Sequence, residues 1–369
     1  HTPERIHPMN IAETILQNDE KAVYRLRSLY RSYGYTPYKM SKFEEYDLYV
    51  RNKDFLVSDS VITFTDKSGK LMALKPDVTL SIIKNNKDVT DGVQKLCYNE
   101  NVYRISDENG SYKEIMQTGL ECIGQIDTYC LCEVLSLAAQ SLGAIVDDFI
   151  LDVSHLGIVS AVLDSLKVSP EGRAALLRCI GEKNPHGISE ICRRESVPSD
   201  GERILRGLIA AYGEPASVMA KLDDLLPAES AKEERRQLRD ILSVLGETRI
   251  RLDFSVVQDM NYYNGIVFKG FVRGIPTAIL SGGQYDRLME RMGRKSGAIG
   301  FAVYLDLLKD LSKAIADYDV DTLVLYDDKT PAAKIAETVE SLIRQGKRAA
   351  AQRSVPEKIT YREIADLRK

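Results

Sequence analysis

Three polar side chains on one predicted β-hairpin have types and spacing suited to holding a small zwitterion. The apolar-rich runs 95–105 and 112–123 flank an Asn-Gly turn signal and so predict two antiparallel strands. Arg104 stands just before the turn, while Gln117 and Glu121 lie two pleats apart on the return strand and therefore share one face. A cation, an amide and a carboxylate on one sheet face suit a free amino acid. The alternative is the solvated outer face of an antiparallel sheet.

Composition limits the classes of protein to consider. The chain has 369 residues, 44% of them hydrophobic and 28% charged, which predicts a globular protein with two or three domains. The net charge of −4 gives no overall signature of nucleic-acid binding. We find no apolar run near the ~18–20 residues of a membrane span and no signal peptide at the start, and so expect a cytoplasmic protein. Six cysteines without a CxxC pair and four scattered histidines predict reduced thiols rather than a zinc site.

The spacing of apolar residues predicts the helices and strands that precede the hairpin. Residues 13–33 have apolar positions at helical spacing, and a strand is expected after Gly34. Residues 61–65 and 70–74 predict a second hairpin. Asp77 and Thr79 then open a helix, where helix capping is the simplest role for both side chains.

The elements after the hairpin begin with a helix over 127–143 and a strand over 149–153. His155, at the start of the next helix, is expected to be a cap or a packed residue rather than a ligand. Residues 160–247 read as several short amphipathic helices separated by Pro-containing breaks. Strands return from residue 250, and the Tyr262-Tyr263 pair suits one ring facing a ligand and the other the core, although generic aromatic packing explains it equally well.

The last residues predict a small separate lobe. Its expected order is a strand over 321–326, a helix over 331–345, a strand over 348–352 and a helix over 361–367, which indicates an α/β arrangement. Basic residues outnumber acidic ones from Arg344 onward. This excess suits contact with RNA, but we expect a solvated face.

Several segments together resemble the class II aminoacyl-tRNA synthetases in the form found in histidyl-tRNA synthetase. Residues 33–49 resemble motif 1, the dimer-forming helix and strand, with Ser41 in place of a proline, and residues 98–124 resemble motif 2. Lys75-Pro76-Asp77-Val78-Thr79 is similar to the family segment R-P-E-x-T. The segments YYNGIVF and GGQYD resemble the histidine-specific signatures, and GAIGFA resembles the start of motif 3.

The resemblance implies an α+β fold, an antiparallel sheet flanked by helices. It covers residues 1–310, with 160–247 as a helical insertion, and is followed by a shortened C-terminal lobe over 318–369. It also implies a homodimer and a histidine-like pocket, with no metal and no cofactor. The pocket residues that it implies are Asp77, Thr79, Arg104, Gln117, Glu121, Gln258, Tyr262 and Tyr263.

The departures from the family pattern fall mainly on charged residues that handle ATP. Leu307, Gln258 and Gln284 stand where arginines are expected, and Ser106 stands where motif 2 has an acid. Because adenylate formation depends on positioned charges, these changes imply little synthetase activity. They also imply weak histidine binding by the isolated chain.

This combination resembles the regulatory subunits of short-form ATP phosphoribosyltransferase, paralogues of the synthetase without catalysis of their own. That resemblance implies assembly with short catalytic subunits, histidine feedback in histidine biosynthesis, and no membrane or nucleic-acid partner. The alternatives are a divergent histidyl-tRNA synthetase and a stand-alone amino-acid-binding protein.

Overall fold

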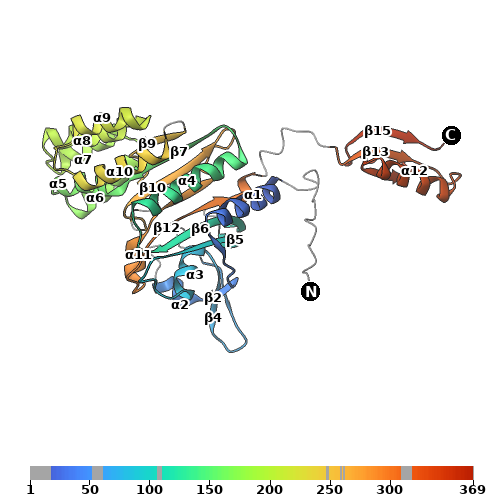
Figure 1. Cartoon of the computed structure of the whole chain (residues 1–369), viewed down its shortest axis with the longest axis horizontal. Helices are drawn as coiled ribbons and strands as arrows, with labels where there is room; N and C mark the ends of the chain where they lie inside the picture. Colours follow the sequence, from blue (N-terminus) through green and yellow to red (C-terminus); the bar gives the residue numbers. More distant parts are fainter. Residues whose placement is uncertain are drawn as a thin grey trace, which may run out of the picture. The chain divides into compact units, whose positions relative to one another are not determined.

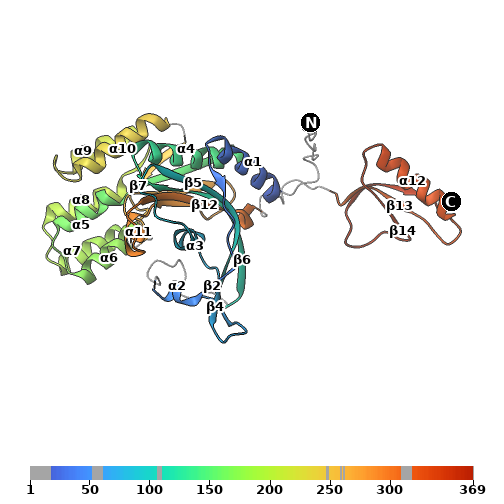
Figure 2. The same ribbon diagram turned by 60° about the horizontal axis from the view of Figure 1, so that its bottom comes forward.

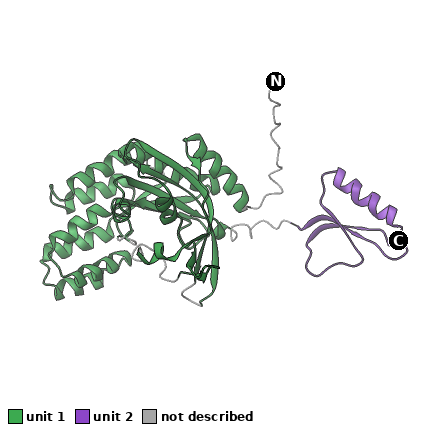
Figure 3. Cartoon of the chain, turned by 90° about the horizontal axis from the view of Figure 1, so that it is seen from below, with its two compact units in different colours: residues 1–311 green, residues 312–369 purple. Residues whose placement is uncertain are grey.

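The computed structural model describes residues 18–51, 61–105, 110–246, 249–257, 260, 262–308 and 318–368. The chain divides into two compact units, residues 1–311 and 312–369, which Figure 3 colours separately. The N-terminal unit contains a nine-stranded sheet, and the C-terminal unit contains a three-stranded one. Gln258 and Ser106, two of the positions at which the sequence departs from the family pattern, lie outside the described residues.

The large sheet of the N-terminal unit is mainly antiparallel, which confirms the expected fold class. Its strand order is β1-β5-β6-β12-β11-β10-β7-β9-β8, and only the pairs β1–β5 and β7–β9 are parallel. The strands are β1 (Thr36–Pro37), β5 (Val93–Ile105), β6 (Tyr112–Gly124), β7 (Phe149–His155), β8 (Tyr212–Gly213), β9 (Ile250–Asp253), β10 (Ile266–Val272), β11 (Leu280–Gln284) and β12 (Gly297–Tyr304).

The predicted central hairpin is present as β5 and β6. Its register pairs Glu100 with Gln117 and Leu96 with Glu121. On the other side of β6, Glu121 pairs with Gly300 of β12. Side chains alternate between the faces of a strand, so Gln117 and Glu121 lie on the same face, as predicted.

Helices cover the two faces of this sheet differently, as Figures 1 and 2 show. One face packs against α1 (Asn18–Ser32) and α4 (Thr128–Ile145), whose Leu26 and Leu135 are fully buried. The opposite face carries a second core cluster built from α3 (Val78–Asn85) and α11 (Asp286–Arg291). A small sheet in the order β2-β4-β3 lies beside them, formed by β2 (Phe43–Glu45), β3 (Thr63–Thr65) and β4 (Leu71–Leu74), with α2 (Tyr46–Arg51) next to it.

Helix α4 corrects one expectation from the sequence. It is long and apolar enough to cross a membrane by length and composition, although no run of that length was expected. Leu131, Val134 and Leu142 of α4 are almost completely buried in the main core. Packing against the sheet therefore accounts for its apolar character.

The predicted helical insertion follows β7. Its helices are α5 (Leu156–Ser165), α6 (Pro170–Gly181), α7 (Pro185–Arg194), α8 (Ser199–Ala210), α9 (Pro215–Leu225) and α10 (Lys232–Leu245). Ser169 and Asn184 cap α6 and α7, each followed by proline at the first helical position. His155 caps α5 by accepting a hydrogen bond from the Gly157 amide at 3.1 Å, so the capping interpretation of this histidine is confirmed.

The C-terminal unit contains β13 (Val320–Leu325), α12 (Ala332–Arg344), β14 (Ala349–Gln352) and β15 (Tyr361–Asp366), with strand order β14-β13-β15. The helix expected over 361–367 is wrong, because this segment is strand β15, parallel to β13. A segment this short gains little as an isolated helix, whereas the open edge of β13 offers hydrogen bonds along its whole length.

Candidate functional site

A cavity of about 480 Å³ lies on the sheet face opposite α1 and α4. Its walls come from the start of α3, the β5–β6 hairpin, strands β11 and β12, and helix α6 of the insertion. Seven of the eight pocket residues expected from the sequence line this cavity: Asp77, Thr79, Arg104, Gln117, Glu121, Tyr262 and Tyr263. The eighth, Gln258, lies outside the described residues.

Glu121 is the most buried acid of the cavity. Its side chain is 2% exposed, the Thr79 hydroxyl donates to Oε1 at 2.8 Å, and the Tyr285 hydroxyl donates to Oε2 at 2.6 Å. None of the described lysines or arginines pairs with it. Burial therefore dominates over these two hydrogen bonds and raises the pKa of Glu121 to about 8. The cavity thus holds a carboxyl group that a cationic ligand group would ionise.

Asp77 serves both as a helix cap and as a cavity wall. Its Oδ1 accepts a hydrogen bond from the Leu80 amide at 2.8 Å, which begins α3, and only 8% of the residue is exposed. Burial raises the pKa of Asp77, while the helix-cap bond and the nearby Arg104 act in the opposite direction. Arg104 is held by a hydrogen bond from its Nε to the Pro76 carbonyl at 3.2 Å. The capping role and the pocket role of Asp77 are therefore compatible.

Two glycines, Gly300 and Gly119, form the floor beneath Glu121. A Cβ atom on Gly300 would lie 1.8 Å from Oε2 of Glu121 and 2.5 Å from the Leu120 carbonyl oxygen. A Cβ atom on Gly119 would lie 2.1 Å from the Phe301 carbonyl oxygen and 2.6 Å from the Tyr98 hydroxyl. Both positions require glycine because the neighbouring groups already occupy the space.

Tyrosines form the apolar part of the wall. The rings of Tyr262 and Tyr263 pack edge to face with centroids 4.7 Å apart, and Tyr285 lies 5.9 Å from Tyr262. Tyr98 and Tyr304 also line the cavity. Tyr98, Tyr285 and Tyr304, together with Ala174 and Leu177 of α6, were not identified from the sequence. The alternation along β5 and the GGQYD segment were the available signals for Tyr98 and Tyr285.

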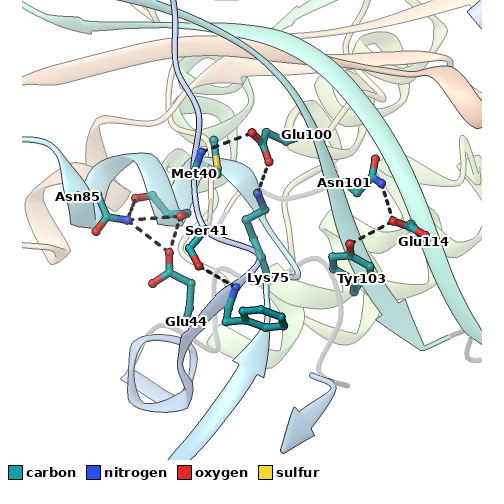
Figure 4. Close-up of polar contacts among 11 residues, drawn as sticks. Met40, Ser41, Glu44, Lys75, Asn85, Glu100, Asn101, Tyr103 and Glu114 are labelled. Atoms are coloured by element: carbon teal, nitrogen blue, oxygen red, sulfur yellow. Dashed lines mark hydrogen bonds and ion pairs between the residues drawn. The ribbon is translucent and has the colours of Figure 1, made fainter. Parts of the chain in front are cut away.

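The residues at positions where the family pattern has arginine are engaged elsewhere. Leu307 packs against the main hydrophobic core. Gln284 donates from Nε2 to Oδ2 of Asp286 at 2.6 Å. Lys75 is fully buried and forms an ion pair with Glu100 at 2.9 Å (Figure 4). Among the described residues that line the cavity, Arg104 is the only cationic one.

The arrangement has the groups needed to bind a small zwitterion. One guanidinium, two buried acids and several hydroxyl groups can hold an ammonium group, a carboxylate and a polar side chain. The part of the chain that the structure describes contains no cluster of three or more His, Cys, Asp or Glu residues able to hold a metal ion. All six cysteines are free, and Cys179 is the only one that is not buried. Burial raises the pKa of Cys122, the cysteine that follows Glu121, so its thiol is not an activated nucleophile.

Replacing Glu121 with glutamine is expected to flatten the pH dependence of stability. The folded state holds this proton up to about pH 8, whereas the unfolded chain releases it near the ordinary glutamate pKa of 4.5. The free energy of unfolding therefore falls as pH rises between these two values. Above about pH 8 the wild type bears the full free-energy cost of burying the ionised Glu121 carboxylate. E121Q should therefore be more stable than the wild type there by up to a few kcal/mol. Urea unfolding at about pH 5.5, 7 and 8.5 measures this difference. If the free energy of unfolding changed equally with pH in both proteins, Glu121 would not carry a proton in the folded state.

Comparison with known proteins gives consistent matches. The sequence profile described as histidyl-tRNA synthetase matches residues 11–308. The ATP phosphoribosyltransferase regulatory subunit of Caldanaerobacter subterraneus subsp. tengcongensis is 31% identical over 289 residues, which are 76% of this chain and 75% of that protein.

Solved structures share the fold. An ATP phosphoribosyltransferase regulatory subunit/histidyl-tRNA synthetase from Bacillus halodurans C superposes with a TM-score of 0.74 at 21% identity, covering 95% of this chain and 93% of that one. A chain of the ATP phosphoribosyl transferase (HisG:HisZ) complex from Thermotoga maritima gives 0.61 at 19% identity, covering 78% and 97%. At these identities the two structures establish the fold alone.

Proposed function

The chain belongs to the histidyl-tRNA synthetase family and, within it, to the ATP phosphoribosyltransferase regulatory subunits, and from this premise we propose that it regulates a short-form ATP phosphoribosyltransferase without catalysis of its own. The single observation that carries the proposal is the composition of the cavity. The groups that suit an amino acid line this cavity, whereas Leu307 packs against the hydrophobic core and Gln284 is hydrogen-bonded to Asp286. The scaffold thus retains a binding site without the charges that adenylate formation needs.

The proposed partner is the short catalytic subunit of that enzyme. The Thermotoga maritima chain with the same fold comes from an ATP phosphoribosyl transferase complex, which supports an assembly of this kind. We also propose that the chain pairs with a second copy through α1 and the strand that follows it, and that it acts in the cytoplasm in histidine biosynthesis. Closed two-fold pairing is the commonest arrangement of soluble oligomers.

The proposed effector is free histidine, bound in the cavity. Its carboxylate would lie against Arg104 and its ammonium group against Asp77, while Gln117 and the tyrosine hydroxyls would hold the imidazole. Without an arginine at position 258, one charge-assisted contact worth roughly 1.5–3 kcal/mol is missing, and affinity falls by about ten- to a hundred-fold relative to an active synthetase. The isolated chain should therefore bind histidine weakly, and tight feedback should require the catalytic partner.

The purified chain is expected to show no histidine-dependent exchange of pyrophosphate into ATP. The reason is the loss of the cations that would hold ATP and stabilise the adenylate, each worth about 10²–10³ in rate. L307R is the informative variant, because restoring one arginine should not restore exchange while Gln258 and Ser106 remain. Exchange by the wild type at a rate typical of synthetases would favour a divergent histidyl-tRNA synthetase.

A further inference from the structure

We propose that a buried ion pair positions Asp77 and Arg104, the two charged residues that would receive the ends of the amino-acid ligand. The pair joins Lys75 to Glu100, and neither of these residues is among those that line the cavity. Lys75 and Glu100 are thus positioning residues, which act on a ligand only through the charged groups of the cavity wall. This role rests on the function proposed above, because it assumes that an amino acid binds in the cavity.

The side chain of Lys75 is buried, and Glu100 determines where its charge lies. Lys75 is 0% exposed, and its Nζ donates to Oε2 of Glu100 at 2.9 Å (Figure 4). Oε1 of Glu100 accepts from the Met40 amide at 3.4 Å, which holds the carboxylate from its other side. Burial lowers the pKa of Lys75, whereas the hydrogen bond to Glu100 and the charge of Glu100 act in the opposite direction. Lys75 therefore depends on Glu100 to carry a charge in this buried position.

The short segment 75–77, which leads from β4 into α3, is attached to β5 at three points. The ion pair is one of them. The Tyr103 amide donates to the Lys75 carbonyl at 2.9 Å, and Nε of Arg104 donates to the Pro76 carbonyl at 3.2 Å. Pro76 has no N–H group and so contributes no donor of its own. Because Asp77 follows these attachments directly and caps α3, a displacement of Lys75 would displace the Asp77 carboxylate.

The register of the hairpin places the ion pair beside the cavity. Glu100 pairs with Gln117 of β6, and Gln117 lines the cavity. Arg104 lies four residues after Glu100 and therefore shares its face of β5. The Lys75 ammonium group also acts on Asp77 through space. Burial raises the pKa of Asp77, and Lys75 is among the groups that act against this effect of burial.

Stabilisation of the fold does not by itself account for a buried ion pair. Apolar residues of similar volume often stabilise a protein as well as such a pair does, because they carry no cost of desolvation. Removing one partner is costly, since it leaves the other charge buried and uncompensated, whereas replacing both partners can be neutral. A variant without either charge can therefore fold, and such a variant separates positioning from stability.

Histidine binding by the full-length double variant K75M/E100M, measured by saturation-transfer NMR, tests the proposal. We expect its affinity for histidine to be at least about tenfold lower than that of the wild type, because the two ends of the ligand lose positioned partners. The matched control E45M/K70M removes an exposed ion pair of the small sheet, in which Nζ and Oε1 are 2.7 Å apart, and should bind as the wild type does. Thermal unfolding shows whether each variant is folded. If K75M/E100M does not fold, E100Q replaces it with the same expected result, since glutamine keeps an acceptor for the lysine.

Hydrogen exchange provides a second measurement that needs no ligand. The Leu80 amide donates to Oδ1 of Asp77, and the Cys130 amide donates to Oδ1 of Asp127 in an equivalent cap at the start of α4, each at 2.8 Å. The double variant should exchange the Leu80 amide several-fold faster than the wild type does and the Cys130 amide at the same rate. A general loss of stability would instead speed the exchange of both amides.

The proposal is overturned if the folded double variant binds histidine as tightly as the wild type does, or if exchange at Leu80 and at Cys130 changes equally. Equal weakening of histidine binding in E45M/K70M would also overturn it, since that result would indicate an effect unrelated to the buried pair. If the wild type itself bound no histidine, the proposed effector would be wrong. Faster exchange confined to Leu80 would in that case still support the positioning of Asp77 by the ion pair.

Discussion

Replacing Gly300 with alanine is expected to weaken histidine binding by this chain at least about tenfold, because the new methyl group needs the space that Glu121 occupies. The added Cβ would lie 1.8 Å from Oε2 and 2.5 Å from Cδ of this buried side chain, with the Leu120 carbonyl oxygen also at 2.5 Å. Since the Leu120 carbonyl belongs to the backbone of β6, the strand cannot yield easily. Glu121 must then leave the Thr79 and Tyr285 hydroxyls, and the cavity loses its deepest acid.

Saturation-transfer NMR detects the weak binding expected of the isolated chain and suits this comparison. G143A is the matched control, because a Cβ on Gly143 of α4 would lie 3.3 Å from the edge of the Phe149 ring and nothing else comes closer than 3.9 Å. Alanine also favours a helix over glycine, so the control should remain folded. Thermal unfolding of G300A separates lost binding from lost structure. Unchanged histidine binding by a folded G300A would show that histidine does not bind beside Glu121.

Strand alternation allowed the sequence to predict one side of the cavity. Gln117 and Glu121 were expected on one face because side chains repeat every second residue, and the register of β6 against β5 and β12 places them there. The positions of Asp77, Thr79, Tyr262 and Tyr263 were expected through the family resemblance rather than through spacing. The structure brings them to the same cavity although α3 and the second half of the sheet are far apart in sequence.

The remaining features depend on tertiary contacts that local patterns do not contain. Glu121 was expected to be anionic, but its charge state follows from complete burial beside two hydroxyl donors. The wall contributed by α6 depends on how the insertion folds back over the sheet. Strand β15 depends on the free edge of β13, which no property of residues 361–366 reveals. The sequence showed Lys75 at a position where the family has arginine. It did not show that the Lys75 ammonium group forms an ion pair with Glu100.

The second large effect is expected from assembly with the catalytic partner. If this chain is the regulatory subunit, the short catalytic subunit from the same genome should form a stable complex with it. ATP phosphoribosyltransferase activity should depend on this chain for its response to histidine. The change in activity caused by histidine is expected to be large. A ligand that binds the inhibited state about a hundredfold more tightly than the active state shifts the equilibrium between them by about 2.7 kcal/mol.

The most direct test of the regulatory function is a histidine titration of phosphoribosyltransferase activity, with the catalytic subunit alone and with this chain added. We predict that histidine inhibits the mixture but not the catalytic subunit alone, and that sedimentation shows both chains in one particle. The same histidine response with and without this chain, or no complex at micromolar concentrations, would contradict the assignment of this chain as the regulatory subunit.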